Sequence, residues 1–159
     1  MNFDPQAYLD ATLVEPTTSK REPIPAGEYS AVAGAPAFRG GEVSPEGQQK
    51  MRDKGRPVKT HWLCLDIPWE IEDSSVKAKM GIDVVTVRQS LMLDIDEDLK
   101  IDNGKGKNIR LGRLREALLL NDGQFNPRMI QGRRAIIRVK QRPEGEEIYN
   151  DVDGVAPLS

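Results

Sequence analysis

The stretch "VKTHWLCLDIPWEI", residues 58–71, alternates apolar and polar side chains with a period of two. This period is typical of a β-strand that buries one face. Pro68 cannot donate a backbone hydrogen bond, so regular pairing is expected to end there, or the strand to lie at an edge. The expected inward side chains are Leu63, Leu65 and Ile67, and the expected outward ones are Thr60, Trp62, Cys64 and Asp66.

Three further segments also predict strands. Residues 83–95, "DVVTVRQSLMLDI", repeat the same period, with inward Val85, Val87, Leu91 and Leu93 and outward Thr86, Arg88 and Ser90. Residues 132–158, "GRRAIIRVKQRPEGEEIYNDVDGVAPL", predict a closing hairpin that turns at "PEGE". Upstream, residues 26–38, "AGEYSAVAGAPAF", predict a first strand entered through a turn at Gly27.

Residues 109–121, "IRLGRLREALLLN", have a helical period instead. Leu111, Leu114 and Leu118 fall on one face of such a helix. Asn108 is expected to cap its start, and residues 121–123 to end it. The expected order is therefore three strands, one helix and two strands, which is a mainly β fold.

A chain of 159 residues suits one domain with one core. Residues 1–24 are expected to form an N-terminal arm, because "EPTTSKREPIP" is too rich in proline and polar residues to pack. The folded domain is expected over residues 25–159. Within it, residues 39–57 have almost no apolar content and glycines near both ends, which predicts a long, mobile, basic loop.

Several classes of protein are not expected. No segment approaches the roughly 20 apolar residues of a membrane helix, and the first residues lack the pattern of a secretory signal, so we expect a cytoplasmic protein without a membrane partner. The single Cys64 excludes an internal disulfide and a cysteine-built zinc site. Cys64 and the single His61 would point to opposite faces of a strand, so they are not expected to form a nucleophile pair.

Charge is unevenly divided along the chain, although its net value is −2. Residues 100–142 contain twelve Lys and Arg against three Asp and Glu. Acidic segments lie on both sides, with nine acids against three bases in residues 60–99 and five acids against no base in residues 143–159. A basic block of this kind attracts phosphate even within a slightly acidic protein.

Basic side chains also share one face of the strand expected near residue 138. They are Arg134, Arg138, Lys140 and Arg142. A strand face that carries only positive charges indicates contact with a nucleic acid, because a face exposed only to solvent usually mixes charges of both signs. The alternative is an edge strand that lysine and arginine protect from aggregation. The same two interpretations apply, with less weight for ligand contact, to Arg110, Arg113 and Arg115.

The glycine-lysine loop before the helix is not a phosphate-binding loop of ATPases. Asn108 stands where such a loop has serine or threonine, and Gly104 is too close to Gly106. Lys105 and Lys107, together with amides at the helix start, could still hold a nucleic-acid phosphate, or the loop could simply be solvated. Asp94, Asp96 and Asp98 do not continue as a calcium loop, and a nuclease-like set of Asp83 with residues 98–100 is not favoured. We therefore expect no metal or other cofactor.

Aromatic side chains are few, so each candidate for base stacking stands out. Trp62 is expected on the face opposite Leu63, and Tyr149 in the last hairpin. Each would serve as a platform for a base, or pack under a loop. Trp69, beside Pro68, is expected in the core.

These features together resemble a protein family. The expected element order, the entry "PIPAGEY" at residues 23–29 and the closing hairpin are similar to those of bacteriophage replication-module proteins that bind single-stranded DNA. The resemblance covers residues 25–158 and rests on Pro25, Gly27, Tyr29, the helix at 109–120 and the segment 132–157. It implies a five-stranded, partly open OB-like barrel. The long acidic tail of many such proteins has only "EGEEIYNDVDG" in its place, which leaves partner recruitment through the C-terminus in doubt.

The resemblance and the charges lead to one functional expectation. The chain would be a non-enzymatic protein that coats single-stranded DNA during phage replication or recombination in the host cytoplasm. Phage replication proteins would be partners, and self-association is left open. The expected contacts, with the 39–59 segment folding over the strand, are Trp62, Arg88, Lys105, Lys107, Arg134, Arg138, Lys140, Arg142 and Tyr149.

A different class of function stays open beside it. The arm of residues 1–24 would grip a neighbouring subunit in a protein-interaction or capsid-decorating module of a virion. The acidic 60–99 segment of one copy facing the basic 100–142 segment of another would suit such self-assembly.

Overall fold

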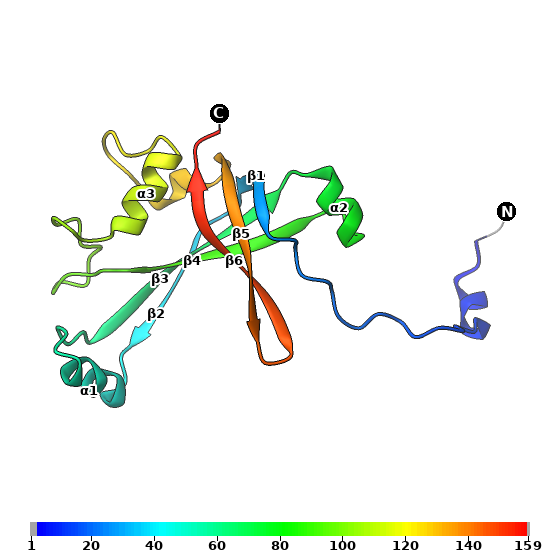
Figure 1. Ribbon diagram of the computed structural model, residues 1–159, viewed down its shortest axis with the longest axis horizontal. Coiled ribbons are helices and arrows are strands. Elements are labelled where there is room, and N and C mark those ends of the chain that lie inside the picture. Colours follow the sequence, from blue (N-terminus) through cyan, green and yellow to red (C-terminus); the bar gives the residue numbers. More distant parts are fainter. Residues whose placement is uncertain (1–2, 159) are drawn as a thin grey trace.

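The computed structural model describes residues 3–158, which form one curved antiparallel sheet with short helices around it (Figure 1). Its strands are β1 Gly27–Ala33, β2 Ala37–Glu42, β3 His61–Ile71, β4 Val85–Leu93, β5 Arg134–Glu144 and β6 Glu147–Ala156. Its helices are α1 Pro45–Asp53, α2 Ser74–Met80 and α3 Ile109–Ala117, with 3-10 turns η1 Pro5–Asp10 and η2 Pro127–Ile130.

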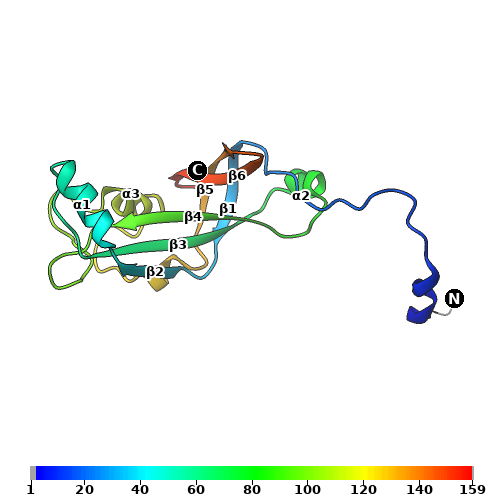
Figure 2. The same cartoon turned by 90° about the horizontal axis from the view of Figure 1, so that it is seen from below.

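The long strand β3 lies at the centre of the sheet. One edge of β3 pairs with β4 along its length, from Leu63↔Leu93 to Ile71↔Val85. The other edge pairs first with β2 and then, through its last residues, with β1. β1 continues the sheet to β5 and β6. Figure 2 shows β2, β3 and β4 running alongside one another.

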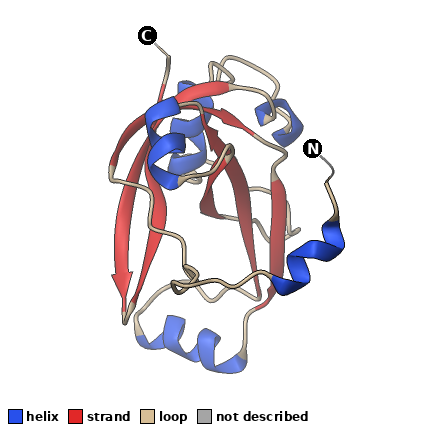
Figure 3. Ribbon diagram, turned by 90° about the vertical axis from the view of Figure 1, so that its right-hand side faces the viewer, coloured by secondary structure: helices blue, strands red, loops and turns tan. Residues whose placement is uncertain are grey.

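The prediction of a mainly β fold is confirmed, but the number of strands in the described chain is six rather than five, and they do not close into a barrel. Residues 27–42 form two strands because the chain breaks pairing at residues 34–36, where the Gly34 N–H bonds to the Pro68 carbonyl at 2.7 Å and Pro36 has no N–H to donate. The sheet also remains open, since within residues 3–158 no ladder joins β4 to β6. The strands nevertheless curve (Figure 3), and β4 and β6 lie near each other.

The segment predicted as a mobile loop, residues 39–57, is largely ordered. Its first part is β2, which pairs with β3 through its backbone although all of its side chains are exposed. Its second part is α1, where the Ser44 side chain accepts a hydrogen bond from the Gly47 N–H at 3.0 Å and Pro45 takes the first turn. Neither element buries an apolar face, and this explains why hydropathy gave no sign of them.

The core lies between the sheet and α3. It contains the predicted inward side chains of β3 and β4, and Leu111, Leu114 and Leu118 close it from the helix side. Trp69 is fully buried, as predicted, and its indole N–H donates to Gln89 Oε1 at 2.8 Å. Leu65 and Ile137 are also fully buried.

Both ends of α3 differ from the prediction. The helix ends at Ala117, because Leu119 takes a left-handed conformation with φ 59°. At the start, Asn108 does not cap the helix through its side chain. Its amide group instead accepts from the Asp94 N–H at 2.7 Å and donates to the Asp102 carbonyl at 2.8 Å, which ties down the 94–108 loop.

Two features near the ends of the sheet complete the fold. The β5–β6 hairpin turns at residues 145–146, where Gly145 has φ 62°, a value that favours glycine. Residues 3–23 run away from the sheet and are exposed up to Glu22, and the Ile24 N–H then joins Asn150 Oδ1 at 2.9 Å.

Helix α2, capped by Asp73, was not predicted. In the described part of the chain, no helix has the length and apolar character to cross a membrane.

Candidate nucleic-acid interface

The predicted basic face of β5 is occupied by ion pairs. Arg134 Nε lies 3.1 Å from Glu72 Oε1, and Arg142 Nε lies 2.7 Å from Asp151 Oδ2. Asp153 accepts from both remaining cations, at 2.8 Å from Arg138 Nε and 2.6 Å from Lys140 Nζ. The hydrogen bonds from Lys140 and Arg138 hold the pKa of the Asp153 carboxyl below its usual range. A phosphate approaching this strand would therefore compete with carboxylates that are already in place.

Tyr149 lies in the same hairpin. Its ring is half-exposed, and the Arg142 guanidinium lies 5.3 Å from its centroid. The distance is that of a cation–π contact. The arginine thus shares the ring surface on which a base would have to stack.

A second surface is formed by the outward side chains of β2, β3 and β4, which we call the outer face. Its members are Arg39, Trp62, Cys64, Asp66, Arg88, Ser90 and Met92, of which Cys64 and Asp66 are buried although the ladder places them on this side. Met92 is 57% exposed and lies opposite Cys64 in the ladder, two residues along β3 from Trp62. This arrangement gives the outer face an apolar area bordered by cations.

Trp62 lies over β2 because the residue opposite is a glycine. A Cβ at Gly41 would approach the indole Nε1 to 3.3 Å, so any larger residue would press on the ring. The side chain is half-buried, with the rest of its surface in solvent. A flat, supported indole of this kind can stack against a base.

Arg39 is fixed on the outer face by Asp66. The guanidinium makes a two-point contact, with Nε 2.5 Å from Oδ2 and Nη2 3.1 Å from Oδ1, and the Ser90 hydroxyl donates to Oδ1 at 2.6 Å. The hydrogen bond from Arg39, followed by that from Ser90, holds the pKa of the buried Asp66 carboxyl far below its usual range. Arg39 itself remains half-exposed, so its remaining N–H groups can meet an anion.

Arg88 also lies on the outer face, opposite Pro68 in the ladder. It is exposed, and no Asp or Glu of residues 3–158 lies within ion-pair distance of it. Its charge contributes to the lowered pKa of Asp66. Of the predicted site residues, the structure therefore brings Trp62 and Arg88 onto one surface and adds Arg39 and Met92 to them.

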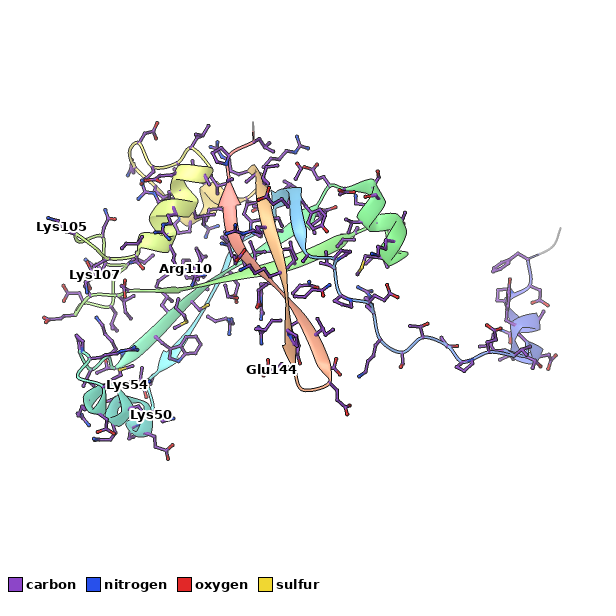
Figure 4. The ribbon with its side chains drawn as sticks, viewed as in Figure 1. Lys50, Lys54, Lys105, Lys107, Arg110 and Glu144 are labelled. Carbon is purple, nitrogen blue, oxygen red and sulfur yellow. The ribbon has the colours of Figure 1, made fainter. Side chains whose placement is uncertain are left out.

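More lysines lie at the end of the sheet where β4 finishes. Figure 4 shows Lys50 and Lys54 of α1 on the same side of the molecule as Lys105 and Lys107. All four are exposed, and none forms an ion pair within the described chain. They form a loose basic border next to the outer face.

At the start of α3, a carboxylate would compete with an incoming phosphate. The Asn108 N–H donates to Asp94 Oδ2 at 2.9 Å, so a carboxylate of the chain already stands at this helix end. Lys105 and Lys107 are exposed in the loop before this helix end, and contact of these residues with a phosphate stays a prediction. Among residues 3–158 there is also no group of three or more His, Cys, Asp or Glu that could hold a metal ion.

Comparison of the chain with models of protein families, with curated proteins and with solved structures gives no match. The functional assignment therefore depends on the geometry of this surface.

Proposed function

We propose that this chain binds single-stranded DNA on the outer face, without strong sequence preference and without catalysis, as a component of phage replication or recombination. The observation that carries the proposal is a row on an open three-stranded surface: Trp62, supported by Gly41, is followed along β3 by Arg39, opposite Cys64, and then by Arg88, opposite Pro68. Stacking on an aromatic ring combined with phosphate neutralisation is the usual means of binding an unpaired strand.

The strand order also supports the proposal. If β1 and β2 are taken as one interrupted strand, the neighbours follow the sequence β4, β3, β1, β5, β6, with β6 returning toward β4. This is the strand order of a partly open OB-like barrel. Oligonucleotides lie on the second and third strands of such barrels, flanked by the loop after the first strand. Here the corresponding elements are β3, β4 and the α1 segment.

The β5 cations have a smaller part in this proposal than the sequence suggested. Each is already paired with a carboxylate, whereas Arg88 pairs with none in the described chain. Binding would then depend on the outer face and on the basic border at α1. Host cytoplasm remains the expected location, and phage replication proteins remain the expected partners.

The test of the proposal is a titration of labelled oligothymidylate, followed by fluorescence anisotropy at several salt concentrations. We expect log K to fall linearly with log salt, by about 0.7 per phosphate contacted, and an unlabelled double strand to compete poorly. Neutralising two lysines of α1, as Lys50→Gln with Lys54→Gln, should reduce the slope by about 1.

A matched control removes the same charge elsewhere. The pair Lys77→Gln and Lys79→Gln lies on α2, which Figure 1 shows at the opposite end of β4 from the 94–108 loop. We expect the slope of this control to equal that of the unmodified chain. Equal slopes for all three proteins would remove α1 from the interface, and equal affinity for double and single strands would overturn the proposal.

One observation favours a second candidate, a protein-interaction module that uses the N-terminal arm. The arm exposes apolar side chains that a solvated tail would not need, namely Phe3, Tyr8, Leu9, Leu13 and Val14. The ring centroids of Phe3 and of Tyr8 in η1 lie 5.9 Å apart. Such a group suits docking on a neighbouring subunit, as in a virion component.

Removal of residues 1–19 separates the two candidates. We expect the shortened chain to stay folded, because Lys20 still reaches Glu147 and Ile24 still bonds to Asn150. If the arm joins subunits, sedimentation will show a smaller particle than for the whole chain at the same concentration. Unchanged sedimentation would argue against the arm as a link, and DNA affinity measured on both proteins shows whether it also serves the outer face.

A further inference from the structure

The gap between β4 and β6 contains an open pocket of about 250 Å³. It is bordered on one side by α3, and it lies on the inward side of β4, away from the outer face. Its apolar lining is formed by Leu91, Leu114 and Val155. Its polar lining is formed by Gln89, Arg110, Arg113, Arg138 and Asp153.

Gln89 presents donors to this pocket. Its side chain is 94% buried, since only 6% of the residue is exposed. The carbonyl oxygen accepts from the Trp69 indole, which is a donor only, so the other end of the amide must be the NH₂ group. Among the described residues no acceptor is bonded to this NH₂, which belongs to the lining of the pocket. No fully buried side-chain nitrogen or oxygen of residues 3–158 lacks a hydrogen-bond partner, so this NH₂ reaches the open space of the pocket, where water or a ligand can accept from it.

Two arginines of α3 add positive charge at the same place. Arg110 and Arg113 are three residues apart, so both lie on the helix face toward the pocket. Both are exposed, and neither has a carboxylate within ion-pair distance in residues 3–158. Figure 4 shows Arg110 between α3 and β4.

Arg138 approaches from β5 across a glycine. It stands opposite Gly154 of β6, and a Cβ at that glycine would come within 3.2 Å of Arg138 Nη2. The bare backbone therefore lets the guanidinium lie over β6 toward the gap. One oxygen of the Asp153 carboxylate accepts from Arg138 Nε, and the other oxygen pairs with Lys140. Arg138 Nη1 and Nη2 therefore remain available as donors to a ligand.

We propose that this pocket binds a phosphate group. The polar side chains that line the pocket and still have free N–H groups are those of Gln89, Arg110, Arg113 and Arg138. Three of these four are guanidinium groups, which suit phosphate oxygens. A volume below the roughly 300–1,000 Å³ of most ligand sites fits a phosphate with its sugar rather than a dinucleotide. The source is either the terminal phosphate of a DNA strand or a free phosphate ester, and the site does not depend on DNA binding by the outer face.

The test uses inorganic phosphate and the whole chain, labelled with ¹⁵N, at constant ionic strength. We expect saturable shifts in the NMR signals of the Gln89 side-chain NH₂ and the Gly154 N–H. Arg110→Gln with Arg113→Gln should weaken phosphate binding at least about tenfold. The pair Lys77→Gln and Lys79→Gln removes the same charge from α2 and should leave the affinity unchanged. Absence of saturation, or equal loss in both double variants, would overturn the proposal.

A second variant acts without removing charge. Gly154→Val should push the Arg138 guanidinium away from the gap and weaken phosphate binding severalfold, while Ala156→Val on the same strand should not. Once phosphate binding is established, oligonucleotides with a 5′-phosphate and a 5′-hydroxyl assign its source. Tighter binding of the first, lost in the Arg110 and Arg113 variant, identifies a DNA end, and equal binding identifies a free ester. If the outer face does not bind DNA, oligonucleotide binding will be lost, but the NMR shifts caused by inorganic phosphate will remain.

Discussion

Replacement of Trp62 by alanine is expected to weaken the binding of oligothymidylate by about tenfold to a hundredfold, the effect of removing one stacked base. The indole lies over Gly41 and is the only tryptophan on the outer face, so no neighbouring ring can replace it. Phenylalanine at the same position should recover part of the affinity, because it restores a smaller flat ring. Anisotropy of a labelled oligonucleotide measures the effect without depending on the fluorescence of the residue that is removed.

Tyr149→Ala is the matched control for this experiment. Tyr149 is also a half-exposed aromatic residue on a strand, but Arg142 already lies over its ring. We expect its removal to change affinity less than about threefold, and unfolding by urea should show that both variants remain folded. A large loss for Tyr149→Ala with none for Trp62→Ala would move the interface from the outer face to the closing hairpin, where the sequence first placed most of it.

The parts of the fold that the sequence predicted are those with a buried face. β4 and the first half of β5 alternate because every second side chain enters the core, and α3 repeats its leucines for the same reason. β3 shows the same alternation of residue types, although Cys64 and Asp66 are buried as well. β2 and α1 bury no side chain, so their pairing and capping leave almost no trace in hydropathy. Ser44 followed by Pro45 was the available signal for α1, and it was outweighed by the surrounding glycines and charges.

The site was harder to predict, because it depends on which strands become neighbours. The cations of β5 were visible in the sequence, but Asp151 and Asp153 lie across a hairpin whose register shifts at a bulge between Arg138 and Val139, and Glu72 follows a distant strand. Arg39 was assigned to a loop, and its place beside Asp66 follows only from the pairing of β2 with β3. The exposure of Met92 could have been predicted, since it occupies an outward position of the predicted strand β4.

Asp66→Asn is expected to lower the free energy of unfolding by about 2 kcal/mol near neutral pH, because the variant loses the charge that Arg39 and Ser90 stabilise. The pKa of Asp66 is depressed in the folded state, so its contribution is fully present above the ordinary carboxyl pKa of 3.8. The contribution falls as the pH drops below that value, since the unfolded chain then takes up the proton first. The difference between the two proteins should therefore shrink steadily between about pH 4 and pH 2.

Urea unfolding at a series of pH values, followed by the fluorescence of the buried Trp69, measures this difference. Asp151→Asn is the control, because Asp151 also pairs with an arginine but is half-exposed, and exposed pairs contribute about 1 kcal/mol or less. Arg39→Gln should raise the pKa of Asp66 toward or above its ordinary value, because the largest cause of its depression is removed while burial remains. A difference between Asp66→Asn and the unmodified chain that stayed constant down to about pH 2 would show that Asp66 is not ionised in the fold. Arg39 would then have no fixed anchor on the outer face, and its part in DNA binding would have to be withdrawn.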